Sequence, residues 1–469
     1  MAKVSLTHMD MTKGNLFWKM GLFSLPMFLT FVFQLLYSTI DLLTVHFMGG
    51  GQTSMSAVQA NGSLISLIII VFSNMSLGAN VSVANAKGAN DREKASKVLH
   101  TSIIFSTVSG LGVAVVGYFV SGYLLQLMGT SEHIIDLATI YLKIYFIGVP
   151  FIIIYNYVSQ IMRALGDSTT PLVILLISGL INVAADILFV AAFHMDVDGV
   201  AWATVLSEVV SSVLGVLFFV FSKKSFINLH WKELKIDRTA MKDIVRIGLP
   251  AGFQGFFFAL PNVFIQAKLY QVDPGNTQLT DGAIASSNIE GYIYAGIEAI
   301  YSAAMSFTAQ NYGAKNKENI RKVFRYSLLW VFLFCLLVDL IIGFAYQPLL
   351  KLYVDTPEAI EAGRQRLWVV GFTYLLDGIM DMFSGSMRGV RHSTFPMVTT
   401  LITCTIFRIV MLETVFNIPL FHTVIWLYAV FPASWILADI MDLVGYLILM
   451  PKAYKEMGLL PAATKEEAK

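Results

Sequence analysis

The sequence predicts an all-α integral membrane protein in which twelve transmembrane helices form two six-helix repeats. Three observations carry this prediction: the composition, an internal repeat and the charge of the loops. Hydrophobic residues make up 56% and charged residues 13% of the 469 positions, against about 45–50% and about 25% in soluble domains. The formal net charge is +1, so no overall electrostatic field favours nucleic acid as a partner.

The second half of the chain repeats the first. The segment 83–89, VANAKGA, aligns with 308–314, TAQNYGA, and Met162-Arg163 aligns with Met387-Arg388 at the same offset of 225 residues. Six spans return the chain to its starting side of the membrane, so the two repeats run in the same direction. We therefore expect a pseudo-two-fold axis along the membrane normal, as in transporters built from parallel repeats.

Apolar segments can be counted along the chain, because a helical span needs about 20 residues. The twelve segments are 16–48, 55–82, 98–122, 134–163, 171–193, 199–221, 245–270, 282–311, 323–346, 360–387, 395–418 and 423–450. The first six form a predicted N-lobe, 16–221, and the last six a predicted C-lobe, 245–450. A cytoplasmic linker, 222–244, joins the lobes, and cytoplasmic tails, 1–15 and 451–469, flank them.

The loops between these segments alternate in charge. The basic set includes Lys87, Arg92, Lys94, Lys97, Lys232, Lys235, Arg238, Lys242, Lys315, Lys317, Arg321 and Lys322; the other set includes Glu132, Asp196, Asp198 and Asp281, and residues 351–366 are mixed. Basic loops face the cytoplasm by the positive-inside rule. The sequence thus predicts a multi-pass protein of the plasma (inner) membrane with both termini in the cytoplasm.

Two carboxylates lie at matched depth inside the predicted spans, where charge is costly and usually functional. Asp41 stands seven residues before the end of the first span, and Asp186 seven residues before the end of the fifth. At 1.5 Å per residue, each lies about 10 Å below the outer boundary. Asn182 shares a helix face with Asp186, and Thr204 reaches a similar depth in the sixth span. These oxygens suit Na⁺; alternatively, the two carboxylates share a proton.

The simpler explanation is that an aspartate near a helix end is a cap or an interfacial group. The shared depth of Asp41 and Asp186 favours a site for a coupling ion. Their counterparts in the second repeat are not acidic, so we expect this site in the first half only. The second-half counterparts of Asp41, Asn182, Asp186 and Thr204 are Gln266, Phe407, Met411 and Ala429.

A substrate cavity facing the cleft between the lobes is expected to have aromatic and acidic walls, because these attract organic cations. Asp377 and Asp381, four residues apart in the tenth span, fit an acidic lining and a structural ion pair equally well. The candidate cavity residues are Gln34, Tyr37, Asn156, Met162, Met305, Asp377 and Asp381.

Neither a cofactor nor an enzymatic site is expected. The two cysteines, Cys335 and Cys404, each lie in an apolar run, which is typical of small buried side chains and not of a disulfide or zinc framework. No His/Asp pair or metal-spaced cluster lies at membrane depth, which argues against a membrane-embedded enzyme. The expected bound ion is the coupling ion alone, H⁺ or Na⁺.

The order of several short motifs resembles the multidrug and toxic compound extrusion (MATE) family over nearly the whole chain. The motifs are Pro26…Gln34…Tyr37…Asp41, Gly88-Ala89, the run RALGDSTTP at 163–171, Gly248-Leu249-Pro250 and Arg388…Pro396. In members of the DinF-like type, the resemblance implies an N-lobe cation or proton site at the positions of Asp41, Asn182, Asp186 and Thr204.

The resemblance also implies an activity. Such proteins are secondary antiporters that export organic, cationic or amphipathic compounds in exchange for H⁺ or Na⁺, by alternating access of two lobes. It further implies a monomer whose partners are small organic substrates and membrane lipids. The alternative is a lipid-linked oligosaccharide flippase of the same superfamily. A flippase would need a strongly basic cleft, and the basic residues here lie mainly in loops.

Overall fold

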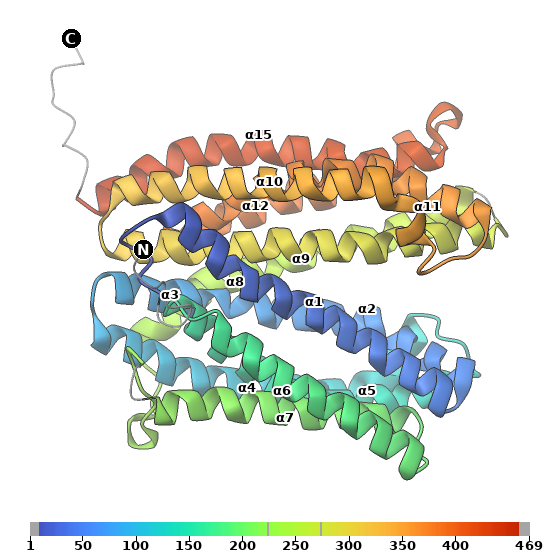
Figure 1. Ribbon diagram of the computed structural model, residues 1–469, viewed down its shortest axis with the longest axis horizontal. Helices are drawn as coiled ribbons and strands as arrows, with labels where there is room; N and C mark the ends of the chain where they lie inside the picture. Colours follow the sequence, from blue (N-terminus) through green and yellow to red (C-terminus); the bar gives the residue numbers. More distant parts are fainter. Residues whose placement is uncertain (1–8, 223–224, 273, 459–469) are drawn as a thin grey trace. The chain divides into compact units, whose positions relative to one another are not determined.

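The protein is helical in the part of the chain that the computed structural model describes, residues 9–222, 225–272 and 274–458 (Figure 1). No β-strand occurs among those residues. Eleven helical segments there are long and apolar enough to cross a membrane. The remaining predicted span lies in α9 (Thr277–Gly313), which is long enough but more polar, with Glu290 and Glu298 in its sequence. Of the predicted tails, residues 1–8 and 459–469 lie outside the described residues.

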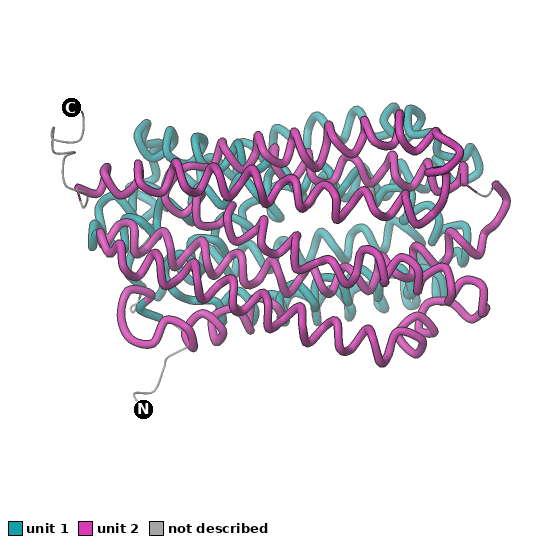
Figure 2. Tube along the Cα trace, turned by 90° about the horizontal axis from the view of Figure 1, so that it is seen from above, with its two compact units in different colours: residues 1–10, 29–252 teal, residues 11–28, 253–469 magenta. Residues whose placement is uncertain are grey.

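The chain divides into two compact units (Figure 2). Unit 1 comprises residues 1–10 and 29–252, and unit 2 comprises residues 11–28 and 253–469. The unit boundaries therefore fall inside two long helices, α1 (Leu16–Met48) and α8 (Arg238–Val272). The lobes 16–221 and 245–450 remain predictions. They differ from the packing units in two places: the first part of α1 packs in unit 2, and the first part of α8 packs in unit 1.

Unit 1 is built around α5. Besides parts of α1 and α8, its elements are α2 (Gly51–Met75), α3 (Leu77–Gly88), α4 (Arg92–Leu127), α5 (Ile135–Ala164), α6 (Thr169–Asp186), η1 (Ile187–Ala192), α7 (Val197–Phe221) and η2 (Trp231–Glu233). α5 packs against α2, α3, α4 and α7, and α6 packs against α7. The side chains from Tyr157 to Ala164 on α5 are all buried, so this end of the helix forms the core of the unit.

Glycines permit a close crossing between the α2–α3 junction and the first part of α8. A Cβ atom on Gly78 would lie 2.1 Å from the carbonyl oxygen of Ile244, and one on Gly248 would lie 2.2 Å from that of Met75. Any larger side chain would force the two backbones apart, which is why small residues mark such contacts. α8 therefore begins as a part of unit 1.

The segment that precedes α8 is fastened to α4 by two neighbouring residues. The ring of His100 contacts the carbonyl oxygen of Ser96 through Nδ1 (2.8 Å), and its Nε2 accepts from the backbone N–H of His230 (3.1 Å). The hydroxyl of Thr101 accepts from the backbone N–H of Asp237 (3.0 Å). Asp237 in turn caps α8, because its Oδ1 accepts from the N–H of Ala240 (2.8 Å).

Unit 2 is built around α9. Its further elements are α10 (Lys317–Leu350), α11 (Pro357–Val369), η3 (Gly371–Thr373), α12 (Tyr374–Gly389), α13 (Thr394–Thr400), η4 (Leu401–Phe407), α14 (Arg408–Glu413), η5 (Val415–Asn417), η6 (Pro419–Phe421) and α15 (Val424–Glu456). α9 packs against α10, α11 and α12, and α15 packs against α12. Arg366 of α11 and Glu290 of α9 form a buried pair with two parallel hydrogen bonds of 2.8 Å each.

The first part of α1 packs within unit 2 through aromatic side chains. The rings of Phe17 and Trp330 stack with centroids 4.8 Å apart, and the indole N–H of Trp330 donates to the carbonyl oxygen of Phe17 (2.9 Å). Phe23 meets Phe307 of α9 edge to face, at 5.7 Å. Aromatic pairs of this kind contribute about 0.5–1.5 kcal/mol beyond the area they bury.

Most predicted spans correspond to one helix, and four are interrupted. The span 55–82 divides at Ser76 into α2 and α3, and the span 360–387 divides into α11 and α12 around a 3₁₀ turn. The fifth and eleventh spans each contain a π-helical segment, η1 and η4. The predicted linker 222–244 is shorter in the structure, because α8 already begins at Arg238.

Candidate functional site

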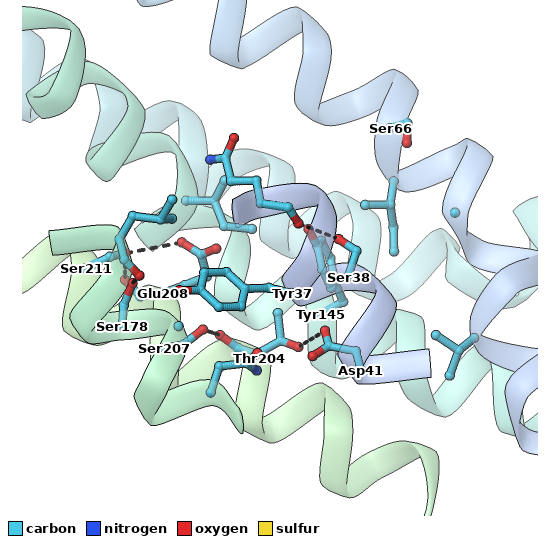
Figure 3. Close-up of a pocket in the computed structure, with 18 of the residues that line it drawn as sticks. Tyr37, Ser38, Asp41, Ser66, Tyr145, Ser178, Thr204, Ser207, Glu208 and Ser211 are labelled. Atoms are coloured by element: carbon cyan, nitrogen blue, oxygen red, sulfur yellow. Dashed lines mark hydrogen bonds between the residues drawn. The ribbon is translucent and has the colours of Figure 1, made fainter. Parts of the chain in front are cut away.

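Unit 1 contains a cavity of about 480 Å³, a size typical of small-molecule sites. Its lining residues come from α1, α2, α5, α6 and α7 (Figure 3). One wall depends on a glycine: a Cβ atom on Gly179 of α6 would lie only 2.0 Å from the ring of Tyr37 on α1. Gly179 thus lets the Tyr37 ring approach the backbone of α6 closely.

Asp41 and Thr204 face each other across the cavity (Figure 3). The hydroxyl oxygen of Thr204 lies 3.5 Å from Oδ2 of Asp41 and 3.0 Å from the carbonyl oxygen of Val200. A hydroxyl has one proton, and the shorter contact to Val200 claims it. The hydrogen bond from Thr204 to Oδ2 of Asp41 is therefore long and weak. A cation placed between these oxygens would be held by lone pairs of both.

Asp186 and Asn182 complete the polar cluster from α6. The carboxyl group of Asp186 lies close enough to that of Asp41 for a hydrogen bond when one of them carries a proton. Four buried polar atoms here have no hydrogen-bond partner among the described residues: both oxygens of Asp186, Oδ1 of Asp41 and the amide nitrogen of Asn182. Buried polar groups left this way cost about 1–3 kcal/mol each, and an additional species bound among them would offset this cost.

Glu208 lines the cavity together with Asp41; as a charged residue within a predicted span it was a candidate from the sequence, but it was not among the residues predicted for the ion site or the substrate cavity. It lies one turn after Thr204 on α7, and its Oε2 lies 3.3 Å from the hydroxyl of Ser211 (Figure 3). The signal was available in the sequence: an acidic residue within a span, four positions from Thr204 and therefore on the same helix face.

The structure brings together most of the residues predicted for unit 1. Gln34, Tyr37, Asp41, Asn156, Asn182 and Thr204 all line the cavity, and Asp186 lies beside Asp41. The amide nitrogen of Asn156 donates to the hydroxyl of Ser73 (3.0 Å). Met162 does not line this cavity, because its side chain is fully buried in the core of unit 1.

The other predicted cavity residues lie in unit 2. Met305 is fully buried on α9, and Asp377 and Asp381 are buried on α12. Asp377 is attracted to the guanidinium group of Arg408, which is also fully buried. Their part in a substrate cavity stays a prediction.

The cavity in unit 1 can attract positive charge. None of its described lining residues is Lys, Arg or His, whereas Asp41 and Glu208 both line it. Tyr37, Tyr141 and Tyr145 supply aromatic surface. Within the described residues, no group of three or more His, Cys, Asp or Glu side chains is arranged to hold a metal ion. The arrangement is therefore one of paired carboxylates with amide and hydroxyl oxygens.

Comparison with protein families gives a match in each half of the chain. The MatE family model matches residues 26–188 and again residues 250–412. The two matches begin 224 residues apart, within one residue of the internal repeat. Together they cover well over half of the chain.

Individual relatives span nearly the whole chain. "Probable multidrug resistance protein YpnP" of Bacillus subtilis is 26% identical over 85% of this chain and 88% of its own length. "Probable multidrug resistance protein NorM" of Thermotoga maritima is 25% identical over 79% of each chain. A solved outward-facing multidrug resistance MATE family transporter of the MOP superfamily superposes with a TM-score of 0.82 at 20% identity, covering 98% of both chains. This structural likeness confirms the predicted twelve-helix, two-repeat fold.

Proposed function

Because the chain belongs to the MATE family of membrane transporters, we propose that it is a secondary antiporter exporting organic cationic or amphipathic compounds in exchange for H⁺ or Na⁺. The names of its relatives as multidrug resistance and export proteins support this proposal. The observation that carries it is the pair Asp41 and Asp186: two facing carboxyl groups, with no basic side chain among the described cavity residues.

The chemistry of the pair supports coupling to an ion. Two adjacent carboxylates in a poorly hydrated site repel each other. Either one of them takes up a proton, or a metal cation lies between them. Asp41, Asp186, Asn182 and Thr204 would hold Na⁺ through their oxygens, and the carboxyl pair alone would hold H⁺. The ion drives transport to the extent that it binds one arrangement of the protein more tightly than the other.

The cavity also bears on the flippase alternative. A lipid-linked pyrophosphate needs basic groups, because phosphate oxygens are recognised by Lys and Arg. The described residues of this cavity include acidic but no basic side chains. This favours organic cations over a pyrophosphate-linked sugar, and we assign the chain to the DinF-like type of antiporter on the same residues.

The test is transport in proteoliposomes containing the full-length protein, with pH and Na⁺ gradients imposed one at a time and ethidium as cargo. We expect one of the gradients to drive ethidium movement, and we expect Asp41→Asn and Asp186→Asn each to reduce the gradient-driven rate at least about tenfold. Asp339→Asn, which removes a carboxyl group from α10 away from this cavity, is the matched control. Coupling that survives in both unit 1 variants would refute the proposal, as would movement of a lipid-linked oligosaccharide without ethidium transport.

A further inference from the structure

The carboxylate of Glu208 has no firm partner within the protein. Its nearest donor is the hydroxyl of Ser211, 3.3 Å from Oε2, but that hydroxyl also lies 2.9 Å from the main-chain oxygen of Glu208. The single hydroxyl proton is used on the nearer acceptor. Among the described ion pairs none involves Glu208. A negative charge on Glu208 would therefore be balanced by something that enters the cavity.

Aromatic side chains line the same cavity as Glu208. Tyr145 and Tyr155 of α5 line the cavity with Glu208, and the rings of Tyr141 and Tyr145 stack 6.2 Å apart. The hydroxyl of Tyr155 donates to the carbonyl oxygen of Pro171 (2.9 Å), which fixes that ring. A carboxylate next to fixed aromatic rings is the arrangement that binds alkylammonium and aryl cations, through charge and cation–π attraction together.

Glu208 is separate from the Asp41–Asp186 pair. It lies on α7, four residues beyond Thr204, whereas Asp186 contacts Asp41 from α6. The internal repeat places Ala433 at the equivalent position of the second half, so the fold does not require an acidic residue here. One cation bound by the pair would leave the charge of Glu208 unbalanced.

We propose that Glu208 is the residue that binds the positive group of the transported compound, while Asp41 and Asp186 bind the coupling ion. This assignment deepens the proposed function and rests on it. It predicts that the cargo is a monovalent organic cation, with an ammonium or phosphonium centre next to aromatic groups. It also predicts that the cargo and the coupling ion bind at different carboxylates, with Glu208 one helical turn beyond Thr204 on α7.

The test is equilibrium binding to the purified full-length protein in detergent, without any gradient. Tetraphenylphosphonium, whose charge does not titrate, is the cationic probe, and chloramphenicol is the neutral one. We expect Glu208→Gln to weaken tetraphenylphosphonium binding about 10- to 100-fold, as expected for loss of a charge-assisted contact. Chloramphenicol binding, if present, should not change.

Three further variants make the result interpretable. Glu208→Asp keeps the charge and should restore part of the affinity, which would exclude simple misfolding of the glutamine variant. Ser211→Ala should leave affinity within about twofold, because its proton is not committed to the carboxylate. Asp186→Asn should lose ion-driven transport and keep tetraphenylphosphonium binding.

The two proposals fail in different ways. Unchanged tetraphenylphosphonium affinity in Glu208→Gln overturns the assignment of Glu208 and leaves antiport by the Asp41–Asp186 pair standing. Loss of binding in Asp186→Asn equal to that in Glu208→Gln overturns the division of labour between the carboxylates. Absence of cation binding to the unmodified protein overturns both the assignment and the proposed substrate class.

Discussion

The fifth span, in unit 1, and its counterpart in unit 2, the eleventh span, both pass from α-helix into a π-helical segment, and they place opposite charges next to it. In unit 1 the segment η1 directly follows Asp186. In unit 2 the segment η4 directly precedes Arg408. π-helical turns are rare and frequently occur at functional sites. The same backbone irregularity thus presents a carboxylate in one unit and a guanidinium group in the other.

Arg408 and Asp186 also differ in the side chains that surround them. Arg408 lies over the ring of Phe431, with its Cζ atom 4.6 Å from the ring centroid, donates to the hydroxyl of Ser434 (2.8 Å), and attracts Asp377. Asp186 meets Asp41, a group of like charge. Unit 2 therefore has a buried positive side chain, Arg408, next to its π-helical segment. In unit 1 the described lining of the cavity has no positive side chain, so a cation bound there would come from solution. A buried charge is tolerated only when it is compensated, and the Asp41–Asp186 pair has no positive side chain of the described cavity lining to compensate it.

Removing the buried positive side chain of unit 2 should have the largest effect on stability. Arg408→Met removes the hydrogen bond to Ser434 and the contact with the Phe431 ring, and we expect the free energy of unfolding to fall by about 3 kcal/mol. Unfolding in detergent, followed by tryptophan fluorescence, measures this change. Arg364→Met, which removes an exposed pair with Glu361, should cost no more than about 1 kcal/mol. A similar small loss for Arg408→Met would mean that unit 2 does not depend on its internal cation.

A second experiment adds a side chain at Gly179 of unit 1, whose counterpart in unit 2 already has one. The repeat aligns Gly179 with Cys404, and a Cβ atom on Gly179 would overlap the Tyr37 ring. We expect Gly179→Ala to displace Tyr37, to destabilise the protein by about 1–3 kcal/mol and to weaken cation binding. Gly62→Ala is the matched control, because Gly62 also lines the cavity and has no atom within 4 Å of its Cβ position. Equal effects of the two substitutions would contradict a special contact at Tyr37.

Neutralising an acid should have opposite signs in the two units. Asp186→Asn relieves a like-charge contact, so we expect stability in the absence of Na⁺ to stay constant or rise by about 1 kcal/mol. Asp377→Asn removes the neighbour of Arg408 and should destabilise. Thermal unfolding of both variants at neutral pH measures this, and a shift of the same sign in both would remove the contrast between the units.

The smallest effect is expected for a carboxylate outside the membrane-spanning segments. The hydrogen bond from the N–H of Ala240 lowers the pKa of Asp237 below its ordinary value. A lowered pKa in the folded state adds stability that is present above the unfolded value, near 3.8, and is lost as the pH falls through the folded value. Asp237→Asn keeps the cap without titrating. We expect its melting temperature to stay within about 2 °C of the parent at pH 7 and to depend less on pH below about 4.

The elements that depend on one continuous apolar run were predictable from the sequence. The predicted first span, 16–48, coincides with α1, and the last, 423–450, lies within α15 except for its first residue. The depth argument for Asp41, Asn182 and Thr204 placed residues from three spans that the structure brings to one cavity. Equal depth is set by the bilayer, so it can be counted along the chain.

Contacts between side chains of different helices could not be predicted from the sequence. The aromatic surroundings of Arg408 combine residues of α8 and α15 that no spacing rule connects. From the sequence alone, Glu208 could equally be a charged group at the membrane interface. Only its position in the cavity lining shows that it faces the same space as Asp41. Met162 has the same composition signal as a cavity residue, but the packing of α5 buries it completely.

The exchange of helix segments between the two units has a consequence for how the chain can be divided. The residues 16–28 of α1 pack with the second half of the sequence, and residues 238–252 of α8 pack with the first. A gene cut in the segment before α8 would therefore yield two fragments, each carrying half a span whose neighbours were encoded on the other piece. Neither half of the sequence forms a complete packing unit alone, because each unit includes a length of helix from the other half.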